Sequence, residues 1–323
     1  MSLKFGILWS FRNPDFARVP WPELYRSHLD LCVDSEALGY DNIWLTEHHF
    51  VDDGYSPSLM PIAGALAGRT KNIRIGSFLI LLPMHNPVRV AEDTATLDLI
   101  SNGRFDLGVG LGYRPVEFSA QGISPGERGA RLTEGVQIVQ RLLRGESVTT
   151  DGRFSQLTDV QISPPALQQP HPPIWLGALA PKAIERAARL GFHYQSVGPS
   201  ELNAIYDEAL VKHGRRPEDF QPLHYMTEQY LRWFAEAADR SGSDAAENTL
   251  PSVDDMIRTQ HFDFLGEDAI VGTPKDAVEM IAEYRTRGRM THFVCYFPTS
   301  GMPVHQIRDG MTLFAKEVIP HFR

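Results

Sequence analysis

The sequence predicts an α/β fold, a (β/α)8 TIM-type barrel. Apolar strand patterns alternate with helical patterns along the 323 residues, with seven clear strands and a weaker eighth. Strands that alternate with helices of this length indicate βαβ units and a parallel sheet. An open doubly wound sheet is the rival, but residues 9–16 (WSFRNPDF) stand at the first strand–helix junction in place of G-x-G-x-x-G. Barrels of this length are routinely one unit, so residues 1–323 are predicted to form a single domain.

Each strand is a short apolar run bounded by glycine, proline or a charged residue. The predicted strands cover residues 4–10, 42–48, 73–83, 104–112, 173–178, 193–198 and 292–298, with residues 222–233 as the weaker candidate. Apolar residues at helical spacing lie between them. These predict helices over residues 22–38, 58–69, 87–100, 128–144, 181–190, 200–212 and 274–287, and a closing helix to about residue 318. Gly39 is placed to end the first helix, as glycine commonly does.

Two insertions, near residues 145–173 and 233–264, interrupt this alternation. The first has two β-rich runs around Asp151-Gly152, which predict a hairpin, and then becomes proline-rich. The second contains the acidic, aromatic-free segment Asp239–Asp255, which is typical of a surface loop. We expect both insertions on the C-terminal face of the barrel, where they either cover a pocket or serve as solvated connections.

Composition excludes several classes of protein. The formal net charge is −9 and basic residues do not cluster, which argues against nucleic acid as a partner. The first residues do not resemble a signal peptide, and apolar runs stay far below the roughly 18 residues of a membrane helix. Cys32 and Cys295 are the two cysteines, which fits core residues in a reducing compartment rather than a disulfide framework. We therefore expect a cytoplasmic protein without membrane contact.

The segment Ile43–Phe50 (IWLTEHHF) predicts a functional strand end. Alternation places Ile43 and Leu45 toward the helices, and Trp44, Thr46 and His48 toward the barrel interior. His48 is then the inward residue nearest the mouth, and His49 faces the other way as a structural residue. Active sites of such barrels lie at the C-terminal ends of the strands, so His48 is the candidate catalytic residue.

The fourth strand shows the same alternation. Its inward series runs from Arg104 and Asp106, expected to be a structural ion pair, to Gly108 and Gly110. Glycine at the mouth end would let a flat ligand lie against the backbone.

Two other kinds of site are set aside. Adjacent histidines of a strand project to opposite faces, and H-E-x-x-H and cysteine-rich metal motifs do not occur, so we predict no metal site. The G-x-S-x-G motif of serine hydrolases does not occur either. A pocket with an inward imidazole remains, with a phosphate possible at loop and helix N-termini.

Four motifs together resemble the bacterial luciferase-like flavin-dependent monooxygenases. They are E-H-H-F, L-P-x-x-N-P-x-R-x-A-E-D, L-x-x-x-S-x-G-R and G-x-G-Y, within "SEALGYDNIWLTEHHF" and "LAGRTKNIRIGSFLILLPMHNPVRVAEDTATLDLISNGRFDLGVGLGY". The segments "PHPPIWLGALAPKAIERAARLG" and "GTPKDAVEMI" fit as well. The resemblance covers nearly the whole chain except roughly residues 233–264.

The resemblance implies a barrel that often forms a homodimer through its second and third helices. It also implies that reduced FMN arrives from a separate flavin reductase and reacts with O2 to a peroxyflavin, which oxygenates a small organic substrate. His48 would lie near the reactive edge of the flavin ring, and Trp44, Glu47 and His49 are candidates for the substrate pocket. The third-strand end is where many members have a non-prolyl cis peptide beneath the ring. The cofactor-binding candidates are Ser77, Phe78, Leu79, Gly110, Tyr113, Arg114, Gly177, Ala178 and Leu179.

The sequence departs from the family at its phosphate contacts. Leu111 stands where luciferase has a phosphate-binding arginine, and Gly177-Ala178-Leu179-Ala180 replaces the usual Gly-Gly-x-Ser. We therefore expect oxidised FMN to bind weakly. Two alternatives stay open: a deazaflavin-dependent oxidoreductase on the same fold, and a flavin-binding partner subunit without turnover. E-H-H-F favours the monooxygenase, because the deazaflavin branch more often resembles a shorter D-H-F pattern.

Overall fold

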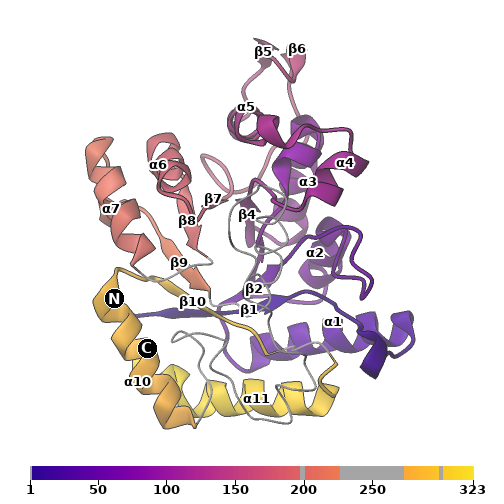
Figure 1. Ribbon diagram of the computed structural model, residues 1–323, viewed down its shortest axis with the longest axis vertical. Coiled ribbons are helices and arrows are strands. Elements are labelled where there is room, and N and C mark those ends of the chain that lie inside the picture. The colour runs from indigo at the N-terminus through magenta and orange to yellow at the C-terminus, as the bar shows by residue number, and fades with distance from the viewer. Residues whose placement is uncertain (1, 197–200, 226–272, 298–300) are drawn as a thin grey trace, which may run out of the picture.

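The computed structural model describes residues 2–196, 201–225, 273–297 and 301–323. Within them, eight parallel strands close a barrel in the order β1-β10-β9-β8-β7-β4-β3-β2, which confirms the predicted fold class (Figure 1). The barrel strands are β1 (Lys4–Trp9), β2 (Asn42–Leu45), β3 (Arg74–Ser77), β4 (Phe105–Val109), β7 (Ile174–Gly177), β8 (His193–Ser196), β9 (Pro222–Tyr225) and β10 (His292–Cys295).

Helices surround this barrel, with α1 and α11 side by side at one edge and α6 and α7 at another (Figure 1). They are α1 (Trp21–Ala37), α2 (Leu59–Ala67), α3 (Pro87–Ile100), α4 (Pro115–Ala120), α5 (Arg128–Leu143), α6 (Pro181–Leu190), α7 (Leu202–Lys212), α10 (Pro274–Arg287) and α11 (Val304–Glu317). The 3-10 turns are Asp15–Ala17, Leu82–Met84, Pro125–Glu127, Pro217–Asp219 and Ile319–Phe322. The described helices include none that is long and apolar enough to cross a bilayer.

Local chemistry explains where several helices begin. Asn86 caps α3, since its Oδ1 accepts hydrogen bonds from the backbone N–H groups of Val88 and Arg89, and Pro87 fills the first helical position. Thr273 and Asp276 form a reciprocal capping box at the start of α10. The Asn86 cap fixes the end of the segment that leads from β3 into α3.

The predicted third strand is shorter in the structure. β3 ends at Ser77, and the chain continues through a cis peptide between Phe78 and Leu79 into the 3-10 turn Leu82–Met84. The weaker strand candidate is real, because β9 closes the barrel between β8 and β10.

An apolar plug fills the barrel interior. It consists of Leu8, Trp44, Phe78, Trp175, Leu223 and Val294, with Tyr296 packed against it. Ile43 and Leu45 belong instead to the larger core between strands and helices, so the predicted alternation of β2 is confirmed. Glycine on the two flanking strands makes room for the Trp44 indole: a Cβ would lie 2.8 Å from the indole at Gly6 and 2.3 Å at Gly76.

The expected pairing of Arg104 with Asp106 is wrong. Asp106 forms a bidentate ion pair with Arg74 of the neighbouring strand, at 2.7 and 3.0 Å. Arg104 is buried and donates to the Ser101, Ile73, Ala67 and Thr70 carbonyls and the Thr70 hydroxyl. Backbone carbonyl groups of a neighbouring loop can thus accept hydrogen bonds from a charged residue at the start of a strand, in place of an ion pair.

The insertion near residues 145–173 contains the predicted hairpin, β5 (Val148–Asp151) paired with β6 (Gln156–Val160). It follows α5 and therefore starts from the N-terminal side of the barrel. Its tip folds back along α5, where Phe154 donates its N–H to Glu134 and Arg153 pairs with Glu127. The insertion near residues 233–264, with the Asp239–Asp255 loop, lies outside the described residues.

Candidate active site at the C-terminal ends of β1 to β4

His48 is the buried centre of a polar cluster that follows β2. Its side chain is 3% exposed, and its Nδ1 lies 2.9 Å from Oε1 of Glu117. Its Nε2 lies 3.3 Å from the Tyr113 hydroxyl, and the rings of Tyr55 and Tyr113 approach its imidazole edge to face. The inward orientation predicted for His48 therefore places it among two tyrosines and a carboxylate.

Glu117, on the short helix α4, orients this imidazole. Its buried Oε1 also accepts the backbone N–H of His49 at 2.9 Å, and Arg114 lies 3.4 Å away. Since a carboxylate can only accept, the proton of a neutral His48 lies on Nδ1 and its Nε2 carries the lone pair. Burial lowers the pKa of His48, opposed by the hydrogen bond and charge of Glu117. At neutral pH the imidazole is then an unprotonated base with a fixed tautomer.

A second polar cluster lies on the other side of the chain at Glu47 and His49. Glu47 Oε1 lies 2.8 Å from Nε2 of His49 and 2.6 Å from Nε2 of His85, and its Oε2 accepts the N–H of Leu81 at 2.8 Å. Burial raises the pKa of Glu47, but these hydrogen bonds and the His85 charge outweigh it and lower the pKa to about 2. The hydrogen bond that His49 donates to the Glu47 carboxylate raises the pKa of His49. Glu47 and His49 therefore face the His85 segment and not the His48 imidazole.

Two glycines near the barrel mouth, Gly110 and Gly177, make room for the Leu79 side chain. A Cβ at Gly110 would lie 2.6 Å from a methyl group of Leu79, and one at Gly177 would lie 2.2 Å from the same atom. The space that these glycines leave is therefore taken by the Leu79 side chain. A flat ligand at the mouth would contact Leu79 rather than the glycine backbone.

Gln195, the third residue of β8, presents an orphaned acceptor near β3. Its Nε2 donates to the Ser77 carbonyl at 3.3 Å, whereas its buried Oε1 has no hydrogen-bond partner among the described residues. Gly108 provides space for this amide, because a Cβ there would lie 2.5 Å from Oε1. A buried acceptor without a donor is costly unless a ligand supplies one.

The candidate phosphate-binding groups are Arg114 and the residues that lead into α6, and they have different surroundings. Arg114 reaches the segment after β2, where it donates to the His49 carbonyl at 2.5 Å. The residues Gly177, Ala178 and Leu179 lead into α6, whose N-cap Ala180 has no side-chain cap. Pro181 has no N–H and the Ala183 N–H donates to the Ala180 carbonyl at 2.8 Å, which leaves the Lys182 N–H as an anion contact at the start of α6.

Trp44 lies beneath the mouth rather than in an open pocket. It is fully buried in the apolar plug and packs edge to face against Phe78 and Trp175.

Four residues of the site were not predicted from the sequence: Glu117, Gln195, Tyr55 and His85. Glu117 and His85 are 69 and 38 residues from the residues they contact, and no local motif links them.

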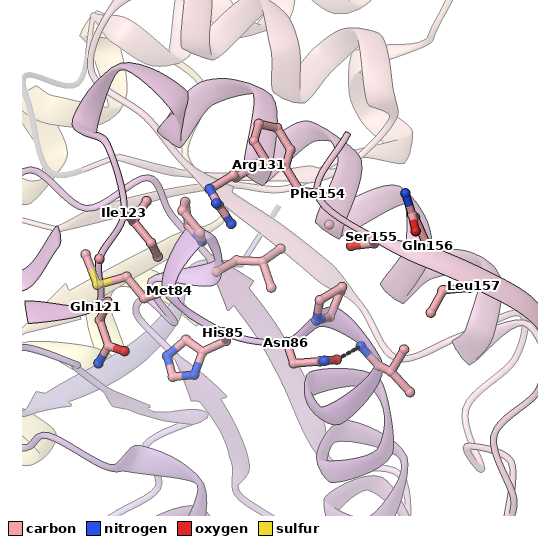
Figure 2. A pocket seen from close by; sticks show the side chains of 16 residues that line it. Met84, His85, Asn86, Gln121, Ile123, Arg131, Phe154, Ser155, Gln156 and Leu157 are labelled. Carbon is pink, nitrogen blue, oxygen red and sulfur yellow. Dashed lines mark hydrogen bonds between the residues drawn. The ribbon is translucent and has the colours of Figure 1, made fainter. Parts of the chain in front are cut away.

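Two cavities border the Glu47 cluster, and both have His85 in their walls. One, of about 460 Å³, lies between the Leu82–Met84 turn and the hairpin tip, with Met84, Arg131 and Phe154 among its lining residues (Figure 2). The other, of about 510 Å³, runs along α2 and α3 and includes Glu47. They flank the polar clusters and open the His85 side to solvent.

Comparison with known proteins identifies the class. The profile of the luciferase-like monooxygenase family matches residues 3–227, so this chain belongs to that family. Two uncharacterised proteins of Sinorhizobium fredii are 34% identical over 51% and 62% of this chain, and the matches span 47% and 58% of their own length. The chain thus spans about half the length of these two relatives.

Relatives that match over most of the chain have names that refer to different cofactors. The oxygenase component of flavin-dependent trigonelline monooxygenase from Acinetobacter baylyi is 25% identical, over 93% of this chain and 90% of its own. F420-dependent glucose-6-phosphate dehydrogenase from Microbacterium testaceum is 29% identical, over 91% and 93%. The crystal structure of monooxygenase RslO1 from Streptomyces bottropensis superposes with a TM-score of 0.83 at 27% identity, covering 99% and 100%. The relatives of this chain thus include both a flavin-dependent and an F420-dependent enzyme.

Proposed function

We propose that this protein is a flavin-dependent monooxygenase that uses reduced FMN and O2 to oxygenate a small organic substrate. The observation that carries the proposal is the buried His48–Glu117 pair, with Nε2 of His48 beside the Tyr113 hydroxyl. A base whose tautomer is fixed by a carboxylate is suited to move a proton at one defined atom. Relatives named as monooxygenases support the oxygenase reading.

The residues at the mouth fit a flavin. The orphaned Oε1 of Gln195 is an acceptor for a ring N–H, and Ser77, Phe78 and Leu79 offer backbone and an apolar surface beneath a flat ring. Gly110 lies behind Leu79, and Tyr113 stands at the His48 side. The start of α6, with backbone N–H groups after Gly177, Ala178 and Leu179, would hold the phosphate, with Arg114 the weaker candidate. Reduced FMN bound there supplies the two electrons with which O2 is activated.

The residues of this chain then have separable tasks. His48 accepts or returns a proton at Nε2, Glu117 holds the ring and stabilises its charge, and Tyr113 shares the proton by its hydroxyl. The plug below, with Trp44 as its centre, excludes water from the underside of the pocket. Glu47 and His49 remain candidates for shaping the substrate pocket through the backbone, because the His49 N–H and carbonyl are bound by Glu117 and Arg114.

A deazaflavin-dependent hydride-transfer enzyme is the second candidate, because an F420-dependent dehydrogenase is 29% identical over most of the chain. Anaerobic titration of the protein with reduced FMN and with reduced F420 separates the two. We expect saturable binding of one reduced FMN per chain, with weaker binding of oxidised FMN because Leu111 provides no charge. Tight binding of F420 together with no binding of reduced FMN would overturn the proposal.

The remaining assignments follow from the same proposal. A separate flavin reductase would supply the reduced FMN, as the words "oxygenase component" in a relative's name suggest for that protein. A homodimer through α2 and α3 would cover the exposed Leu99 and Ile100 at the end of α3. The cytoplasm, where such a reductase and reduced thiols occur, is the proposed location.

A further inference from the structure

Three potential metal ligands converge outside the His48 pocket. The ligand atoms are Oε1 of Glu47, Nε2 of His49 and Nε2 of His85, and all lie within 4.8 Å of one another. Two imidazoles and one carboxylate are the protein ligand set of several catalytic zinc sites. The adjacent residues His48 and His49 bind different carboxylates and do not chelate together, whereas His85, from the segment after β3, meets His49 at Glu47.

The surroundings hold these ligand atoms in place. Glu47 is almost fully buried, and its second oxygen is bound by the N–H of Leu81. The backbone of His49 is bound at both ends, by Glu117 and Arg114. The N–H of His85 donates to the Leu82 carbonyl at 3.1 Å, just before the cap of α3. Such outer contacts orient ligands and strengthen metal binding.

Access and charge also suit a cation. The His85 side chain is 36% exposed and lines both cavities, so an ion can enter from solvent. Glu47 contributes a carboxylate whose side chain is only 2% exposed. The ligand atoms now lie at hydrogen-bond distances of 2.6 and 2.8 Å. They need to separate by roughly 0.5–0.7 Å to reach the spacing of about 3.3 Å around a tetrahedral ion that is ligated at about 2.0–2.1 Å. Each imidazole would give up its Nε2 proton on ligation.

We propose that Glu47, His49 and His85 form a binding site for one divalent zinc-type metal ion. Three protein ligands would leave the remaining coordination position to water on the cavity side. The ion would join the end of β2 to the segment between β3 and α3, and would fix the residue that follows His48. The proposal does not depend on the flavin reaction.

Metal binding to the untagged, chelator-treated full chain tests the site. Zn2+ is titrated against a coloured zinc indicator for wild type, His85→Ala and the matched control His305→Ala, whose histidine is exposed on α11. We expect one Zn2+ per chain for wild type and control, and roughly 100-fold weaker binding for His85→Ala. Circular dichroism verifies that each variant is folded.

The outcomes separate cleanly. Failure of wild type to bind one equivalent, or binding by His85→Ala within about threefold of wild type, would overturn the site. If His85→Ala does not fold, the Co2+ spectrum of wild type decides. Intense visible bands of a four-coordinate ion support the site, and the weak spectrum of a hydrated ion contradicts it.

Discussion

At the scale of single residues, the proposed chemistry rests on Glu117 and His48. A buried carboxylate that accepts from both the His48 ring and the His49 backbone fixes a side chain and its main chain together. The imidazole itself makes ring contacts with Tyr55 and Tyr113 and is only 3% exposed. His48 is therefore part of the packing as well as of the site, and its replacement should also lower stability.

Glu117→Gln tests whether Glu117 acts through His48. The amide keeps the size and an acceptor oxygen but removes the charge that stabilises a protonated imidazole. We expect reduced FMN to bind within about twofold of wild type, while product formed per flavin falls about 10- to 100-fold as peroxide rises. The control Glu127→Gln, at the start of α5, should match wild type. Equal coupling in both variants would show that Glu117 is only structural.

Arg104 shows at the element scale how a loop is tied to a strand. Its guanidinium lies at the start of β4 and donates to carbonyl groups at the end of α2 and in the following loop. Those carbonyls would be left without donors if the guanidinium were removed. A buried donor that serves several acceptors costs more to lose than a surface ion pair.

Arg104→Met should therefore destabilise the protein by about 3 kcal/mol or more. Arg141→Met is the matched control, because Arg141 forms an exposed ion pair with Glu146 and should cost less than about 1 kcal/mol. Urea unfolding followed by circular dichroism gives both free energies. A similar small loss for the two variants would refute the role assigned to Arg104.

Elements of this fold could be predicted from sequence because their signals are local. Strand alternation at Ile43–Leu45 correctly separated the interior from the helix-facing side, and the helix predicted over residues 87–100 matches α3. The partners of the site could not be predicted in the same way. Glu117 meets His48 only because the barrel brings the ends of β2 and β4 together. The close approach of Leu79 to Gly110 and Gly177 could not be predicted either, since Leu79 lies in the segment that follows another strand, β3.

Histidines with lowered pKa values make the stability of the whole molecule depend on pH. Burial lowers the pKa of His28 to about 4. Burial, with the nearby His171, Lys4 and Arg74, also lowers the pKa of His193 to about 4. In the unfolded chain both would titrate near 6.5 and bind protons that the native state rejects. Stability should thus be complete above about pH 6.5 and fall as the pH drops toward 4.

His193→Asn isolates one of these contributions. Nδ1 of His193 accepts the N–H of Gln221 at 3.1 Å, and the asparagine oxygen can take that role without titrating. Between pH 7 and pH 5, wild type should lose about 2 kcal/mol more stability than the variant. Urea unfolding at the two pH values provides the comparison. Identical pH dependence of wild type and variant would rule out His193 as an acid-sensitive group.

The most direct test of the whole account is the reaction of the bound, reduced flavin with O2. Wild type and His48→Gln, each loaded anaerobically with one equivalent of reduced FMN, are mixed with oxygenated buffer, and flavin absorbance and hydrogen peroxide are followed together. We predict that wild type delays peroxide release well beyond the oxidation of free reduced FMN. His48→Gln should release one peroxide per flavin without that delay, and the control His305→Gln should behave as wild type. Indistinguishable time courses for wild type and His48→Gln, both matching free flavin, would contradict the proposed oxygenase function.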